Sequence, residues 1–110
     1  MFKRKNRLVP GVRFNNSYFF IAPQFVLKEK KNGLTINRFG IVVSKKTDKR
    51  AVGRNKIKRF LRTALVKLSG KMNTGHDILF IVKKGMLDKA KEENLFAIEN
   101  ALGKAGIIKR

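Results

Sequence analysis

The chain has 110 residues, and 27 lysines and arginines stand against only 7 acids, which gives a net charge of +20. Hydrophobic residues make up 43% of the sequence, which suffices for a small domain with a modest core and argues against wholesale disorder. The absence of cysteine excludes disulfides, thiolate metal sites and cysteine nucleophiles. Because so large a charge opposes compaction, we expect a polyanionic partner, with nucleic acid ahead of an anionic membrane.

The N-terminal segment, residues 1–13, is basic and is interrupted by Pro10 and Gly11, so we expect a mobile or loosely docked arm. Its basic start is followed by no apolar stretch, and it therefore does not resemble a secretory signal. No run in the chain approaches the roughly 20 apolar residues that span a bilayer. We expect one cytoplasmic domain, residues 1–110, with no membrane partner.

Aromatic residues gather in residues 14–20. Phe14 and Tyr18 are four residues apart, so they share a face only if this segment is helical. Core packing is the default expectation for such side chains. Stacking on single-stranded nucleic acid within a basic groove is the alternative, and both remain open.

Three segments have the length and composition of strands. Residues 25–27 predict a short strand, and residues 28–37 predict a polar, hairpin-like connection that turns at Gly33. Residues 38–44 predict a second strand with alternating faces. Residues 77–83 are almost continuously apolar, which predicts a central strand covered on both faces.

Two further segments predict helices. Residues 49–68 repeat apolar side chains at spacings of three and four, with cations on the opposite side. Residues 87–102 predict a second helix, with Asp88 as its N-cap. The order strand, strand, helix, strand, helix predicts an α+β domain in which the helices cover one face of a small sheet.

The first helix carries the strongest functional signal. No acid lies between Lys49 and Lys71, so its exposed cations lack the usual partners one turn away. Lys49, Arg50 and Arg54 crowd the N-terminal end, where the helix dipole and free N–H groups favour an anion such as phosphate. This pattern indicates contact with nucleic acid. The neutral Asn55 could read a base or sugar edge or cap local backbone.

Catalytic groups are scarce. His76 is the only histidine, and one histidine supplies neither a metal set nor a triad, so we expect an ordinary surface role. Glu92 and Glu93 are the only adjacent acids, and neighbouring helical positions do not face each other. The sequence therefore indicates no hydrolytic site and no cofactor held by the protein itself.

The residues from 44 to 62 resemble the signature of the protein subunit of bacterial ribonuclease P. They read SKKTDKRAVGRNKIKRFLR, with SKK at a strand end, a short basic link, and Arg-Asn-x-x-Lys-Arg-x-x-Arg along a helix. The resemblance covers most of the chain, because RFGIVVSKK and GHDILFIVKKG are similar to the family's flanking strands.

The resemblance implies a small two-layer α/β sandwich, like domain 2 of ribosomal protein S5, with a left-handed βαβ crossover. The general rule alone would predict a right-handed crossover. It also implies a monomer that binds the ribonuclease P catalytic RNA and the 5′ leader of precursor tRNA. The RNA would remove the leader, with Mg²⁺ required by the holoenzyme, and the protein alone would not cleave.

Site residues follow from the same resemblance. The residues expected to contact the catalytic RNA are Lys45, Lys46, Lys49, Arg50, Arg54, Asn55, Lys58, Arg59 and Arg62. Those expected to meet the leader are Phe14, Tyr18 and Lys28. The N-terminus departs from the family pattern in two ways. Pro10–Gly11 breaks the usual helix start, and the segment between Tyr18 and Phe25 is several residues shorter than is usual in the family. We therefore expect an abbreviated or missing first helix.

Three rival functions remain. A structural ribosomal-type RNA-binding protein would share the size and charge of this chain. A DNA-binding regulator would require a positioning helix before the basic helix, where strands are predicted instead. An autonomous nuclease is disfavoured by the missing acid and histidine clusters.

Overall fold

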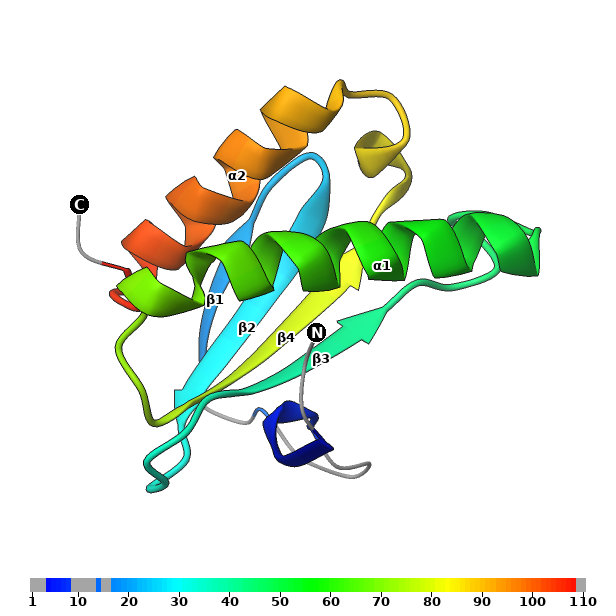
Figure 1. Ribbon diagram of the computed structural model, residues 1–110. Coiled ribbons are helices and arrows are strands. Elements are labelled where there is room, and N and C mark those ends of the chain that lie inside the picture. The colour runs from blue at the N-terminus through cyan, green and yellow to red at the C-terminus, as the bar shows by residue number, and fades with distance from the viewer. Residues whose placement is uncertain (1–3, 9–13, 15–16, 109–110) are drawn as a thin grey trace.

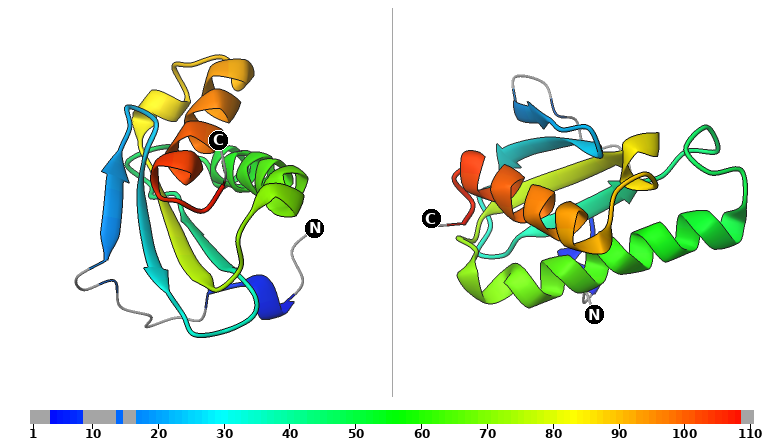
Figure 2. Two further views of the ribbon diagram at one scale, coloured as in Figure 1. Left: turned by 90° about the vertical axis from the view of Figure 1, so that its left-hand side faces the viewer. Right: turned by 90° about the horizontal axis from the view of Figure 1, so that it is seen from above.

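Four strands form one mixed sheet, and both long helices lie on the same face of it (Figures 1 and 2). This computed structural model describes residues 4–8, 14 and 17–108. The sheet order is β1–β2–β4–β3. The elements are β1 (Tyr18–Ile21), β2 (Phe25–Lys31), β3 (Arg38–Val42), α1 (Ala51–Leu68), β4 (His76–Val82), α2 (Lys91–Lys104) and three short 3₁₀ turns, η1 (Arg4–Asn6), η2 (Ser69–Lys71) and η3 (Lys84–Met86).

The β3–α1–β4 connection joins parallel neighbours and has the less common hand. In Figure 1, α1 lies on the viewer's side of the sheet and both strands run toward the upper right. Along that direction β4 lies to the left of β3, whereas a right-handed connection would place it to the right. The crossover is therefore left-handed, and the expected two-layer α+β fold is confirmed.

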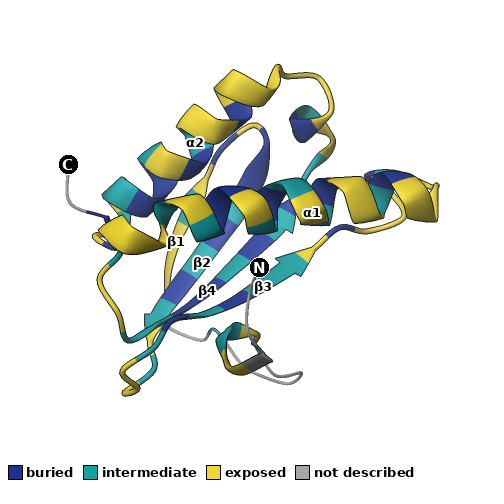
Figure 3. Ribbon diagram, in the orientation of Figure 1, coloured by how far each residue is buried: buried dark blue, intermediate teal, exposed yellow. Residues whose placement is uncertain are grey.

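The core lies between the sheet and the helices (Figure 3). Alternation along the strands sends one set of side chains to the helices, and Phe25 and Phe80 meet there edge to face with ring centroids 5.1 Å apart. From α1, Leu61 and Leu65 are fully buried beneath these strands. The predicted apolar stripe of the first helix is thus confirmed.

The opposite face of the sheet, which we call the open face, carries no helix among the described residues. On β4 it presents Leu79 and Ile81, which are half-buried, while their neighbours Ile78 and Phe80 are buried toward the helices. The prediction of a central strand is confirmed, since β4 lies between β2 and β3. The predicted cover on both faces was wrong, because among the described residues the helices cover only one face.

The main error in element assignment lies in the hairpin that opens the sheet. Residues 18–21 form β1, an antiparallel edge strand on β2, which the sequence analysis did not predict. Strand β2 also continues to Lys31, so residues 28–31 belong to the strand and not to the connection. The charged residues 28–31 show little alternation of apolar and polar side chains, so the sequence alone gives a weak strand signal. Pairing with β1 and β4 decides their conformation.

The second helix begins four residues later than predicted. Its N-cap position is Ala90, and Asp88 lies outside the helix, after η3. The turn at η3 brings Met86 into the core, and Asn94 Nδ2 donates to Met86 O at 3.0 Å. This contact between the η3 turn and α2 depends on tertiary packing and has no signature in the local sequence.

The described part of the N-terminal segment is docked along the sheet edge. Arg7 bridges Phe39 in a parallel sense, and Leu8 N donates to Phe39 O at 3.0 Å. The expected loose arm is therefore wrong for residues 4–8, while Pro10 and Gly11 lie outside the described residues. Among the described residues before β1, η1 is the only helical turn, which agrees with an abbreviated first helix.

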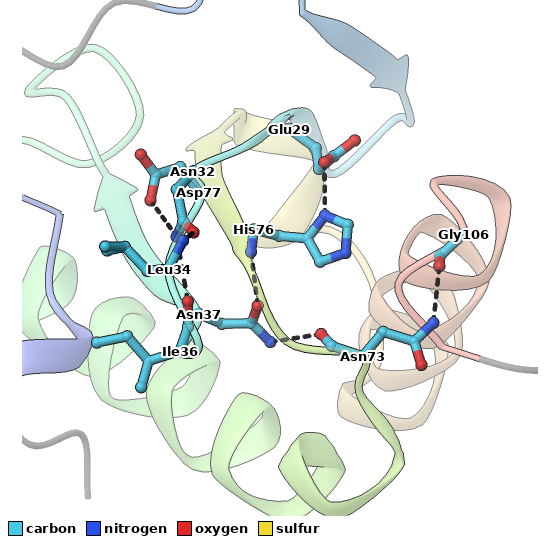
Figure 4. Close-up of polar contacts among 9 residues, drawn as sticks. All are labelled: Glu29, Asn32, Leu34, Ile36, Asn37, Asn73, His76, Asp77 and Gly106. Atoms are coloured by element: carbon cyan, nitrogen blue, oxygen red, sulfur yellow. Dashed lines mark hydrogen bonds and ion pairs between the residues drawn. The ribbon is translucent and has the colours of Figure 1, made fainter.

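A buried polar network ties together the sheet end opposite α1's N-terminus (Figure 4). Asp77 accepts hydrogen bonds from Arg38 Nε at 2.8 Å, Arg38 Nη2 at 2.7 Å and Asn32 Nδ2 at 3.0 Å. Asn37 Oδ1 accepts from His76 N, and Asn37 Nδ2 donates to Asn73 O. Burial raises the pKa of Asp77, but the hydrogen bonds from Arg38 and Asn32 outweigh it, so the pKa lies below its ordinary value.

The expected surface role of His76 is wrong. Its Nδ1 lies 2.7 Å from Glu29 Oε2, and both side chains are about nine-tenths buried on the helix side of the sheet. The partner is 47 residues away in sequence, so only strand pairing reveals it.

Candidate nucleic-acid interface

Helix α1 has one buried face and two exposed flanks, and each flank carries different side chains. Ile57, Leu61 and Leu65 face the sheet, while Arg59 is exposed on the opposite side. On the flank toward α2 lie Lys56, Phe60 and Thr63, which line a groove between the two helices. The flank away from α2 carries Asn55, Lys58 and Arg62, as their angular positions require. The helix therefore brings four of the predicted RNA-binding residues, Asn55, Lys58, Arg59 and Arg62, onto one outward surface.

The other predicted cations lie at the N-terminal end of α1, beyond the end of the sheet (Figure 1). Lys45, Lys46 and Lys49 are exposed in the connection after β3. Arg50 is the N-cap residue, its side chain makes no cap hydrogen bond, and no acid occupies the first helical turn. The positive helix end and these cations therefore add, which favours an anionic partner. We call this set of cations, together with Asn55, Lys58, Arg59 and Arg62, the α1 surface.

Arg54 differs from the other cations because it is half-buried and holds the connection in place. Its Nη1 donates to Asp48 O at 3.0 Å and to Lys49 O at 2.9 Å. With these bonds formed, Arg54 shapes the path of the chain into the helix, and its remaining guanidinium N–H groups are available for an RNA contact.

Asp48 is the acid within this basic surface, and its partner is internal. Its Oδ1 accepts from Arg50 N at 2.9 Å, and Arg50 Nη2 lies 3.3 Å from Asp48 Oδ2. The hydrogen bonds from Arg50 hold the pKa of Asp48 below its ordinary value. Asp48 thereby orders the connection and leaves Lys49 exposed.

Gly53 makes room for the Asp48 carboxylate against the first helical turn. A Cβ at position 53 would collide with Asp48 Oδ2, and Asp48 atoms are the three nearest neighbours of that position. The sequence analysis did not single out Asp48 or Gly53, because the contact depends on how the connection folds back on the helix.

We expect Gly53→Ala to be coupled to Asp48. In an Asp48→Ala background, alanine at position 53 should stabilise the protein by about 1 kcal/mol through helix propensity. In the native background this gain should vanish, because the new methyl group displaces the carboxylate from Arg50. Thermal unfolding of the four proteins of this double-mutant cycle measures the coupling. Equal gains in the two backgrounds would contradict it.

The residues predicted to meet the leader are not all on one face. Lys28 of β2 lies on the open face, and Phe14 lies there too, with Lys30 Nζ 5.5 Å from the centre of its ring. Tyr18 pairs with Glu29, so it lies on the helix side of the sheet. The structure thus brings Phe14 and Lys28 to one face and separates Tyr18 from them.

Phe19, which the sequence analysis did not assign to the leader, lies on the open face, where Tyr18 does not. It is the direct cross-strand partner of Lys28, and the residue is 59% exposed. Leu8 and Leu79 lie close around Gly40 on the same face, where a Cβ would come within 2.9 Å of Leu8 Cδ1. An exposed ring beside a lysine, next to apolar side chains, suits a nucleobase and its phosphate.

Two classes of site are missing from the part of the chain that the structure describes. No three histidine, aspartate or glutamate side chains gather there as a metal-binding group. Nor does any described helix combine the length and apolar character needed to cross a bilayer.

Comparison with models of protein families shows which family this chain belongs to. The model of the family described as Ribonuclease P matches residues 2–106. The chain belongs to the ribonuclease P protein family. The match includes β1 to α2, so it takes in both the α1 surface and the open face.

Curated members of the ribonuclease P protein family are similar along much of the chain. A ribonuclease P protein component of Synechococcus elongatus is 42% identical over 66% of this chain, and the chain spans 60% of that relative's length. One of Clostridium botulinum is 41% identical over 74% of both chains. One of Thermotoga petrophila is 38% identical over 84% of this chain and 73% of the relative.

Solved structures of ribonuclease P proteins share the fold. A Staphylococcus aureus protein superposes with a TM-score of 0.78 at 28% identity, covering 87% of each chain. A Thermotoga maritima protein gives a TM-score of 0.65 at 29% identity, over 83% of this chain and 82% of that one.

Proposed function

We propose that the chain is the protein subunit of a ribonuclease P ribonucleoprotein, which binds the catalytic RNA and the 5′ leader of precursor tRNA and promotes removal of the leader. The observation that carries this proposal is the α1 surface. It presents cations from a rigid helix and its entry, and the acid among them, Asp48, is bound by Arg50. Membership in the ribonuclease P family supplies the class of RNA partner.

The α1 surface acts through positioning and electrostatics. Arginine forks bind phosphate in two-point contacts, while the lysines act as point charges. Because each neutralised phosphate releases condensed counterions, binding of the catalytic RNA should weaken steeply with salt. The same charge offsets the repulsion between the catalytic RNA and its precursor substrate.

The open face receives the leader in this proposal. Phe14 and Phe19 offer ring faces, and Lys28 and Lys30 stand beside them. Single-stranded RNA binds such surfaces by stacking bases on rings while cations follow the backbone. One copy of the chain is sufficient for this role, because both proposed RNA surfaces lie on it. The proposal places this monomer in the cytoplasm.

Hydrolysis belongs to the RNA in this proposal, and Mg²⁺ serves the RNA-containing holoenzyme. Three of the seven acids, Glu29, Asp48 and Asp77, are engaged by His76, Arg50 and Arg38. These carboxylates are therefore poorly placed to hold a metal or to activate water. The chain contributes binding and orientation.

Reconstitution tests the proposal. The protein is mixed with a bacterial ribonuclease P RNA and a precursor tRNA that bears a 5′ leader, at low magnesium, and leader release is followed. Release that requires both protein and RNA would support the subunit role. Tight RNA binding without stimulation would favour the rival, a structural ribosomal-type protein, and cleavage by the protein alone would favour an autonomous nuclease.

We expect Phe19→Ala to weaken leader binding about fivefold to tenfold, because one stacked base is lost. Stability should change little, since the ring is largely exposed. The matched control is Tyr18→Ala, the neighbouring aromatic on the other face of β1. Affinities of the reconstituted holoenzyme for precursors with long and with one-nucleotide leaders measure the effect. A larger loss for Tyr18→Ala would contradict the placement.

A further inference from the structure

A second feature of α1, on the flank toward α2, is a groove of about 590 Å³. The two helices approach each other there on the same face of the sheet (Figure 2). Its apolar lining includes Phe60 of α1 and Met86 and Leu87 near η3. Leu87 is half-exposed, and Phe60 is half-buried. The groove is therefore an open apolar surface, distinct from the outward flank that carries Asn55, Lys58 and Arg62.

Only cations are charged among the residues that line this groove. They are Lys56, Arg59, Lys89 and Lys91, and all four are exposed. Helix α2 begins at Lys91 beside the groove, and its N-cap residue makes no side-chain cap, so the first N–H groups are open to an anion. The acids of that first turn, Glu92 and Glu93, line a different groove against the β1–β2 hairpin.

A buried polar atom points to more than an anion. Asn94 lines the groove and is only 5% exposed, and its Nδ2 donates to Met86 O at 3.0 Å. This bond orients the amide, and Asn94 Oδ1 is left without a hydrogen-bond partner. Most buried acceptors are satisfied, so this shielded, unpaired oxygen at the groove wall is an acceptor that a donor bound in the groove would satisfy. A nucleobase supplies such N–H donors, and a phosphate does not.

We propose that the α1–α2 groove binds one unpaired nucleotide of an RNA strand. Its base lies against Phe60 and Leu87 and donates an N–H group toward Asn94 Oδ1. Its phosphate meets the lysines at the rim and the N-terminus of α2. The inference rests on the proposed RNA-binding function and extends it to a surface that none of the predicted site residues except Arg59 touches.

Titration of the ¹⁵N-labelled full-length protein tests the site. The probes are adenosine 5′-monophosphate, ribose 5-phosphate and inorganic phosphate. We expect adenosine monophosphate to shift the backbone amides of residues 91–93 and the side-chain amide of Asn94. Ribose 5-phosphate should bind about fivefold more weakly, because it lacks the stacked base. Equal affinity for all three probes would reduce the groove to an adventitious anion site and overturn the proposal.

Charge-matched variants make the test independent of folding. Lys56→Ala plus Lys89→Ala removes two exposed rim cations and should weaken adenosine monophosphate about fivefold. Lys31→Ala plus Lys71→Ala removes two exposed cations that lie outside both surfaces and should leave the affinity within about twofold. Equal losses in the two variants would mean that net charge alone attracts the nucleotide, which would also overturn the proposal.

The reconstitution assay separates the two proposals. Leader release that requires the protein, with no shifts in the groove, would reject the groove and keep the subunit role. Specific shifts in the groove without stimulated leader release would keep the nucleotide site and reject the subunit role.

Discussion

Replacing Asp77 with alanine is expected to lower the free energy of unfolding by about 3 kcal/mol. Asp77 is 1% exposed and accepts three hydrogen bonds, two from Arg38 and one from Asn32. Removing the carboxylate leaves the Arg38 guanidinium, whose side chain is only 23% exposed, without its charged partner. Chemical denaturation of the purified variant measures the loss.

The control for this experiment is Asp88→Ala, which removes an exposed acid near η3 and should cost less than about 0.5 kcal/mol. A second readout is the pH profile of stability. Because the pKa of Asp77 is depressed in the folded protein, its contribution is complete above the unfolded pKa, about 4, and is lost as the pH falls through the folded pKa. The Asp77→Ala variant should lack this part of the acid destabilisation. Identical acid profiles for wild type and variant would refute the assignment.

Arg59→Ala plus Arg62→Ala is expected to weaken binding of the catalytic RNA roughly 30-fold at near-physiological salt. Both side chains point away from the sheet, and neither makes a hydrogen bond or ion pair within the described residues, so their loss should leave the fold intact. The slope of log affinity against log salt should also become shallower by about 1.5, because two phosphate contacts are lost.

The matched control for the double arginine variant is again Lys31→Ala plus Lys71→Ala, which removes the same charge elsewhere. Filter binding or fluorescence titration with ribonuclease P RNA over a range of salt concentrations measures both proteins. Equal affinity of the arginine variant and wild type would reject the α1 surface as the RNA site. Equal losses in variant and control would show that net charge, and not this surface, governs binding.

Local patterns predicted both helices and three of the four strands, although β1 was missed and the bounds of β2 and α2 were wrong. The spacing of Ile57, Leu61 and Leu65 predicted the buried face of α1, and the absence of acids near Arg59 indicated its exposed face. Such periodicity belongs to the helix itself and needs no knowledge of its neighbours. The left-handed crossover, in contrast, was expected only from the family resemblance, because physical rules for connections favour the opposite hand.

The assignment of aromatic residues to faces could not come from the sequence. Phe14 and Tyr18 share a face in a helix, but residues 18–21 form a strand, and in a strand Phe19 replaces Tyr18 on the open face. The segment is short and apolar, and its conformation depends on hydrogen bonds to β2 across a turn at Pro23. A shift of one residue therefore changed which ring lies on the open face.

By itself the sequence determined the basic charge, the amphipathic α1 with its outward cations, and the scarcity of catalytic side chains, because these depend on composition and on spacings of a few residues. Only the tertiary structure decided the pairs between distant residues. Asp77 meets Arg38, Glu29 meets His76, and Asn94 lines a groove opposite Lys56. These contacts arise where strands pair and helices pack, across separations for which a local pattern holds no information.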